Sequence, residues 1–180
     1  MGPTSSAIQR PGFLGMSGQS SLDFQCFWIK EVPVKIILSS DEYGELIPAI
    51  QQAVEKAGHE CTYVGPGPGE EKDWPVVTSD AVARVASGEF DEGIVMCWTG
   101  TGATIAANKV KGIRAALCGD AETAKGARVW NHANVLALSM RKTSLPLARE
   151  ILQSWFETPY SSDDWNLKQI QSIRDLESKA

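Results

Sequence analysis

The stretch Gly93-Ile94-Val95-Met96-Cys97-Trp98-Thr99-Gly100-Thr101-Gly102-Ala103-Thr104-Ile105-Ala106-Ala107-Asn108-Lys109 decides the fold of this chain. It begins with a continuous apolar run, passes through a turn with two glycines, and continues into a helical pattern expected over residues 104–110. A short apolar run between breaker residues indicates a strand buried on both faces of a sheet. The stretch therefore predicts a strand, a turn and a helix, with the thiol of Cys97 at the end of the strand.

The same alternation recurs before and after this stretch. Further strands are expected at residues 34–38, 60–64, 113–118 and 135–138, and helices at residues 46–57, 77–86, 121–130, 145–156 and 166–176. Buried strands that alternate with helices predict a single-domain, doubly wound, Rossmann-like α/β fold, with three α/β/α layers and a mostly parallel five-stranded sheet. Ligands of such sheets bind beyond the carboxyl ends of the strands. Residues 1–30, which are rich in Gly, Ser and Pro, are expected to be a flexible tail before a domain at 31–180.

Composition excludes several classes of partner. The 180 residues carry 17 basic and 22 acidic side chains, and the basic ones form no run. We therefore expect no nucleic-acid partner. No apolar run has the length of a membrane span, so no membrane association is expected. The four cysteines are far apart and form no C-x-x-C pair, which is typical of a protein in the reducing cytoplasm.

The turn after Cys97 has the features of a reactive site. Backbone N–H groups at the start of a helix favour negative charge, and the same field favours thiolate over thiol at Cys97. Two other interpretations stay open. A lone cysteine at a strand end is commonly a small buried hydrophobe. Gly100 and Gly102, with Asp120 after the next strand, also form part of a dinucleotide fingerprint, although Ile105 occupies its third small position.

A series of motifs carries a family resemblance from about Val34 to Ile173. The motifs are Cys97-Trp98-Thr99-Gly100-Thr101-Gly102, Ile105-Ala106-Ala107-Asn108-Lys109, Gly112-Ile113-Arg114-Ala115-Ala116-Leu117 and Ala133-Asn134-Val135-Leu136-Ala137-Leu138. Together they resemble the ribose-5-phosphate isomerase B and galactose-6-phosphate isomerase family of sugar isomerases. The resemblance implies an aldose–ketose isomerase that moves one proton through an enediol, without a metal or an organic cofactor.

The resemblance also implies roles for particular residues. Cys97 matches the family's base, Thr99 the threonine that orients sugar oxygens, and Asp41 the aspartate of the D-H-A-G motif. The expected substrate-binding residues are Glu42, Trp98, Gly100, Thr101, Gly102, Trp130, Asn131 and Arg141. Among them, the Gly100–Gly102 amides match an anion-holding turn, Asn131 the family's H-N asparagine, and Arg141 an arginine that contacts phosphate. A homodimer or homotetramer with a shared active site is implied as well.

The chain departs from the family pattern where substrate would bind. Glu42 replaces the histidine after the first aspartate, and Trp130 replaces the ring-opening histidine before Asn131. Indole cannot shuttle a proton at neutral pH as imidazole does. His132 lies two positions further on, where a helix turns it away from that face. The family's C-terminal arginine cluster is missing near residues 165–169, where Lys168 is the basic residue.

These departures predict a sugar or sugar phosphate other than ribose 5-phosphate, either unphosphorylated or shorter. Trp98, beside the base, adds bulk to the expected pocket and also favours a smaller substrate. The alternative function is a catalytically inactive sugar-binding or regulatory subunit with the same fold. Retention of Cys97 favours the enzyme.

Overall fold

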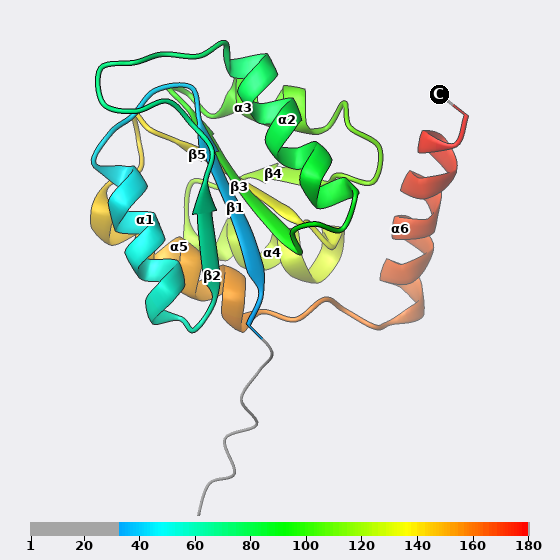
Figure 1. Ribbon diagram of the computed structural model, residues 1–180. Helices are drawn as coiled ribbons and strands as arrows, with labels where there is room; N and C mark the ends of the chain where they lie inside the picture. The colour runs from blue at the N-terminus through cyan, green and yellow to red at the C-terminus, as the bar shows by residue number, and fades with distance from the viewer. Residues whose placement is uncertain (1–32, 180) are drawn as a thin grey trace, which may run out of the picture. The chain divides into compact units, whose positions relative to one another are not determined.

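The computed structural model describes residues 33–179 (Figure 1), and the tail expected over residues 1–30 lies outside them. The strands are β1 (Lys35–Ser40), β2 (Glu60–Tyr63), β3 (Glu92–Cys97), β4 (Ala115–Leu117) and β5 (Val135–Ser139). The helices are α1 (Leu46–Lys56), α2 (Trp74–Ala86), α3 (Thr101–Ala107), α4 (Ala121–Asn131), α5 (Leu145–Glu157) and α6 (Asp164–Glu177). All expected strands and helices are present. Within the described residues, no helix has the length and apolar character needed to cross a membrane.

The five strands form one sheet in the order β2-β1-β3-β5-β4, and every neighbouring pair is parallel. The sheet was expected to be mostly parallel, and it is parallel throughout. β3 lies at its centre, with Ser40 of β1 opposite Met96 and Ser139 of β5 opposite Cys97. The carboxyl ends of β1, β3 and β5 therefore meet around Cys97.

Two apolar cores cover the two faces of the sheet. On one face α1, α4 and α5 pack against alternate residues of the strands, including Ile36, Ile94 and Leu136. On the other face α2 and α3 pack against the remaining alternate residues of the strands, which include Val95 and Cys97. This alternation is the two-residue period of a strand, and it confirms the three-layer α/β/α arrangement.

Three helices begin earlier than their sequence patterns predicted, α6 by two residues, at Asp164. α2 begins at Trp74, three residues before the expected start, with Pro75 in its first turn. α3 begins at Thr101 and ends at Ala107, three residues before the expected end at Val110. Thr101 and Gly102, expected in the turn, are therefore the first residues of a short helix.

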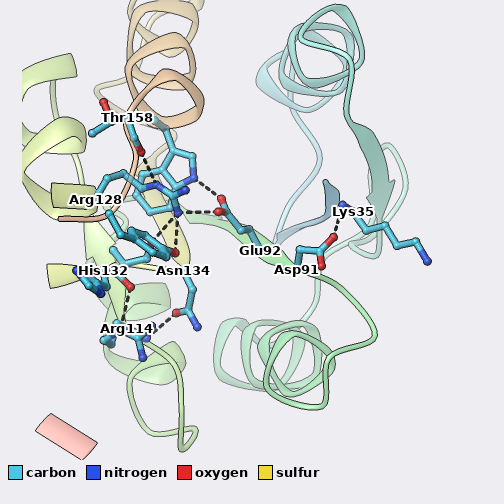
Figure 2. Close-up of polar contacts among 11 residues, drawn as sticks. Lys35, Asp91, Glu92, Arg114, Arg128, His132, Asn134 and Thr158 are labelled. Atoms are coloured by element: carbon cyan, nitrogen blue, oxygen red, sulfur yellow. Dashed lines mark hydrogen bonds and ion pairs between the residues drawn. The ribbon is translucent and has the colours of Figure 1, made fainter. Parts of the chain in front are cut away.

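A buried polar cluster fastens the amino edge of the sheet to the chain between α5 and α6 (Figure 2). The Arg128 guanidinium contacts Glu92 Oε1 at 2.6 Å, and both side chains are only 12% exposed. Trp155 Nε1 donates to the other Glu92 oxygen at 2.6 Å. Arg128 also lies over the rings of Trp155 and Tyr160. A buried charge pair with this many hydrogen bonds fixes the C-terminal end of α4 in place.

Candidate active site

Cys97 ends the central strand β3 and is 6% exposed. Its carbonyl oxygen accepts hydrogen bonds from the backbone N–H groups of Gly100 (3.2 Å) and Met140 (3.1 Å). Asp41 follows the last residue of β1, whose partner in the sheet is Met96, the residue before Cys97. The expected base and the expected aspartate therefore leave neighbouring strands at the same edge.

The turn after Cys97 requires glycine at position 100. Gly100 has φ +76°, and a Cβ there would lie 2.5 Å from Leu117 Cδ1 and 2.9 Å from the Leu138 carbonyl oxygen. The Leu138 carbonyl is part of β5 and cannot give way. The Gly100 amide donates to Cys97, so it closes the turn. As first-turn residues of α3, Thr101 and Gly102 carry the amides that have no acceptor within the helix.

Three of the expected site residues border one cavity. Thr99, Thr101 and Arg141 line a space of about 510 Å³ at the carboxyl ends of β3, β4 and β5, together with Thr123 and Lys142. The hydroxyls of Thr99 and Thr101 are hydrogen-bonded at 2.7 Å. Two cationic side chains and three hydroxyls are donors of the kind that bind an anionic, polyhydroxylated ligand. Cys97 and Asp41 do not line this cavity.

Asp41 has an unusual environment for a carboxylate. Its Oδ1 is buried and has no hydrogen-bond partner among the described residues. Burial raises the pKa of Asp41 above its ordinary value of 3.8, although its own N–H and that of Glu42 oppose the change, and the charge of Glu71 adds to it. Glu42 pairs with Glu71 in an isolated antiparallel bridge, and Lys72 N donates to the Asp41 carbonyl oxygen at 2.8 Å. The loop before α2 therefore covers the end of β1.

The structure does not bring Trp130 and Asn131 to this edge. α4 starts after the carboxyl end of β4 and runs back along the sheet for 11 residues, about 16 Å at 1.5 Å per residue. Both residues end the helix at the amino edge of the sheet. Trp130 is 60% exposed there, and Trp98 is 58% exposed beside Cys97. Within one chain, the two expected halves of the site lie on opposite edges.

Comparisons with known proteins identify the family of this chain. Residues 36–173 fit the family model described as Ribose/Galactose Isomerase. Ribose-5-phosphate isomerase B of Escherichia coli is 34% identical over 147 residues, covering 81% of this chain and 97% of that protein. D-erythrulose-4-phosphate isomerase 2 of Mycolicibacterium smegmatis is 31% identical over 144 residues, covering 78% and 95%. The type B ribose 5-phosphate isomerase structure of Trypanosoma brucei superposes with a TM-score of 0.77 at 40% identity, covering 81% and 99%.

This chain belongs to the ribose/galactose isomerase family. Membership confirms the resemblance drawn from the sequence motifs, and it makes the chain an aldose–ketose isomerase of sugar phosphates.

Neither histidine of the isomerase lies at the carboxyl edge of the sheet. His59 precedes β2 at the amino edge, where its Nδ1 accepts from Val34 N at 3.4 Å and its ring contacts Phe156. The His59 side chain is therefore half-buried in packing. His132 caps α4 with φ +48°, stacks on Tyr160, and lies 2.9 Å from the Ser161 carbonyl through Nε2. His132 is only 8% exposed, so its imidazole is buried in these contacts.

Sequence reasoning missed the role of Asn108. Its side-chain amide donates to the Ala115 carbonyl at 2.8 Å and accepts from the Ala115 N–H at 2.9 Å. Ala115 begins β4, which is an edge strand, so one side chain satisfies the backbone that a further strand would pair with. Asp120 was expected to cap the next helix, and it does: its side chain accepts from Thr123 N at 2.7 Å. An asparagine near the end of a helix gives no sequence signal for such pairing.

No set of three His, Cys, Asp or Glu side chains within residues 33–179 is grouped as metal ligands would be. The groups at the carboxyl edge are a thiol, a carboxyl, threonine hydroxyls and cationic side chains. These are proton-transfer and anion-binding groups.

Proposed function

We propose that the isomerase converts a sugar phosphate between its ketose and aldose forms with Cys97 as the base. The observation that carries this is the position of Cys97 at the end of β3, beside Asp41 and before the Gly100 turn. In the ketose-to-aldose direction, the thiolate removes a proton from C1. The C–H electron pair becomes the C1–C2 double bond, and the carbonyl oxygen becomes an enediolate oxygen. The proton then returns to C2, while the C1 hydroxyl loses its proton to become the aldehyde oxygen and the C2 oxygen gains a proton to become a hydroxyl.

The surrounding groups support this charge movement. The Thr101 and Gly102 amides and the Thr99 hydroxyl are the donors proposed for the enediolate oxygen. Asp41, with its raised pKa, is proposed to exchange a proton with the C1 hydroxyl, which becomes the aldehyde oxygen. Arg141 is proposed to hold the phosphate in the cavity that it shares with Thr99 and Thr101.

The substrate proposed is a sugar phosphate that does not form a ring. An aldopentose 5-phosphate or a hexose 6-phosphate is mostly a closed ring in water, so its isomerase needs an acid and a base to open the ring. His59 and His132 are both engaged in packing, and Trp130 has no titratable group. A four-carbon sugar phosphorylated on its terminal oxygen has no free hydroxyl placed to close a five-membered ring. Such a substrate needs proton transfer alone.

A relative supports the same substrate. The Mycolicibacterium smegmatis protein that aligns with 78% of this chain is a D-erythrulose-4-phosphate isomerase. Trp98 beside the base also reduces the space for a longer sugar. We therefore propose D-erythrulose 4-phosphate and its aldose as the substrate pair. The isomerase is proposed to work in the cytoplasm, where the free thiols of Cys61, Cys97 and Cys118 stay reduced.

The proposed active unit is a homodimer or a homotetramer with shared sites. One subunit would supply Cys97, Asp41 and Arg141, and its partner Trp130 and Asn131. Trp98 and Trp130 are exposed in the single chain, and a subunit interface would bury these large aromatic side chains.

The test is a comparison of three substrates with the purified full-length protein: D-erythrulose 4-phosphate, ribose 5-phosphate and galactose 6-phosphate. NMR would follow each aldose–ketose conversion. We expect conversion of the four-carbon substrate with kcat/KM at least about 100-fold above the other two. Equal or faster conversion of ribose 5-phosphate would overturn the acyclic-substrate proposal. Binding of these sugars without any conversion would instead favour the inactive sugar-binding subunit, to which Trp130 in place of histidine also points.

A further inference from the structure

The ring of Trp130 lies against a glycine in the middle of its own helix. A Cβ placed on Gly126 would lie 2.9 Å from Trp130 Cζ3 and 3.1 Å from Cε3, and its three nearest atoms all belong to this ring. Residues 126 and 130 are one turn apart, so their side chains share a face of α4. Any residue other than glycine at position 126 would force the ring to move.

Gly126 is in an unfavourable place for a glycine. Glycine destabilises the interior of a helix relative to alanine, because it loses more backbone freedom on folding. Where the backbone needs a positive φ, as at Gly100, that cost has a reason; Gly126 is not among the glycines with positive φ. The space it leaves for the Trp130 ring is therefore the structural reason for glycine at this position.

The neighbouring residues hold this turn of α4 firmly. Arg128, in the same turn, is buried against Glu92, and His132, the cap of α4, is buried against Tyr160. On its other side, Trp130 borders a cavity of about 650 Å³ between α4, β4 and α6. The cluster holds the backbone of this turn, and the space left at Gly126 lets the Trp130 ring lie against the helix.

We propose that Gly126 is a positioning residue that sets the orientation of the Trp130 ring for the substrate. The inference rests on the proposed function, in which Trp130 enters the site of a partner subunit. A flat indole face held in one orientation packs against sugar C–H groups and excludes water from the enediol. A freely rotating ring would lose conformational entropy on binding each substrate molecule.

The test combines Gly126→Ala with Trp130→His. The rings of these two side chains differ in the atoms that touch Gly126, because imidazole lacks the six-membered ring of indole. Gly126→Ala alone should keep or raise Tm, since alanine favours the helix and the displaced ring is exposed. It should raise KM for D-erythrulose 4-phosphate about five-fold and leave kcat within about two-fold. In the Trp130→His background, Gly126→Ala should change neither constant.

Two results would overturn the proposal. The first is a Gly126→Ala variant with wild-type KM, and the second is an effect on KM that persists in the Trp130→His background. Absence of any conversion by the wild-type protein would instead reject the proposed function. The ¹⁹F spectrum of 5-fluorotryptophan-labelled protein then decides the ring contact by itself. The Trp130 resonance, assigned by its loss in Trp130→His, should shift in Gly126→Ala, and an unchanged resonance would reject the contact.

Discussion

The backbone N–H of Arg141 donates to the carbonyl oxygen of Trp98 at 3.0 Å, so the loop after β5 is fastened to the turn after the proposed base. Ser139 Oγ reaches the same carbonyl at 3.0 Å. The backbone that carries Arg141 is therefore held next to the turn that follows Cys97 at the carboxyl edge. This arrangement suits a ligand with an anionic end and a reacting carbon a few bonds away.

Arg141→Ala should mainly weaken binding of the phosphate. Loss of a charge-assisted contact costs about 1.5–3 kcal/mol, so kcat/KM should fall about 10- to 100-fold, mostly through KM. Steady-state kinetics with D-erythrulose 4-phosphate measures the change. Arg149→Ala, an exposed arginine on α5, is the matched control and should leave both constants unchanged. A normal KM for Arg141→Ala would place the phosphate elsewhere.

Asp41→Asn should stabilise the protein while it lowers activity. The pKa of Asp41 is raised by burial, so the folded chain binds a proton more tightly than the unfolded chain does. The stabilising effect of Asp41 is therefore fully present below pH 3.8, and it is lost as the pH rises through the pKa that Asp41 has in the folded state. The variant should have a higher Tm than the wild type at pH 7, and the gain should shrink as the pH falls toward 3.8.

Asp120 provides the control of opposite sign. Its hydrogen bond from Thr123 N lowers its pKa, so its stabilising effect is present above 3.8 and is lost as the pH falls. Asp120→Ala should lower Tm at pH 7 through loss of the helix cap. Thermal melts of both variants across pH 3–8 compare the two. A lower Tm for Asp41→Asn at neutral pH would mean that the Asp41 charge stabilises the fold.

Arg128→Met should destabilise the protein strongly. It leaves Glu92 as a buried carboxylate without its cation, which typically costs about 3–5 kcal/mol of unfolding free energy. Adding Glu92→Gln should recover part of the loss, because the remaining group is neutral and still accepts from Trp155 Nε1. Urea unfolding measures all three proteins. A loss below about 1 kcal/mol for Arg128→Met would show that water or another group compensates Glu92.

Mixing two inactive variants should restore activity if the site is shared between subunits. Cys97→Ala removes the base, and a second variant with Trp130→Ala and Asn131→Ala removes the partner's residues. In an equal mixture that exchanges subunits at random, half of the dimers contain one copy of each, and each such dimer holds one intact site. About a quarter of wild-type activity should return. No recovery, with subunit exchange confirmed by native mass spectrometry, would mean that each chain has its own complete site.

The positions of the strands and the parallel character of the sheet could be predicted because short apolar runs, continuous in β3 and β5, alternate with helical patterns. The start of α3 could not, because Thr101 and Gly102 belong equally well to a turn and to the first turn of a helix. The separation of Trp130 from Cys97 could be recognised only from the three-dimensional arrangement. Cys97 lies at the carboxyl ends of the strands, whereas α4 runs back along the sheet and places Trp130 at their amino ends. The packing of His59 and His132 depends on Phe156 and Tyr160, which are distant in sequence.

Hydrogen exchange from solvent into the substrate tests whether Cys97 is the base. D-erythrulose 4-phosphate incubated in deuterium oxide with the wild-type protein should gain deuterium at C1, the carbon from which the base removes a proton. Cys97→Ala should abolish this exchange and keep a cooperative thermal unfolding transition. Cys61→Ala, which removes a half-buried thiol of β2 that does not line the cavity, is the control and should keep the exchange. Exchange at the wild-type rate in Cys97→Ala would contradict the assignment of Cys97 as the base.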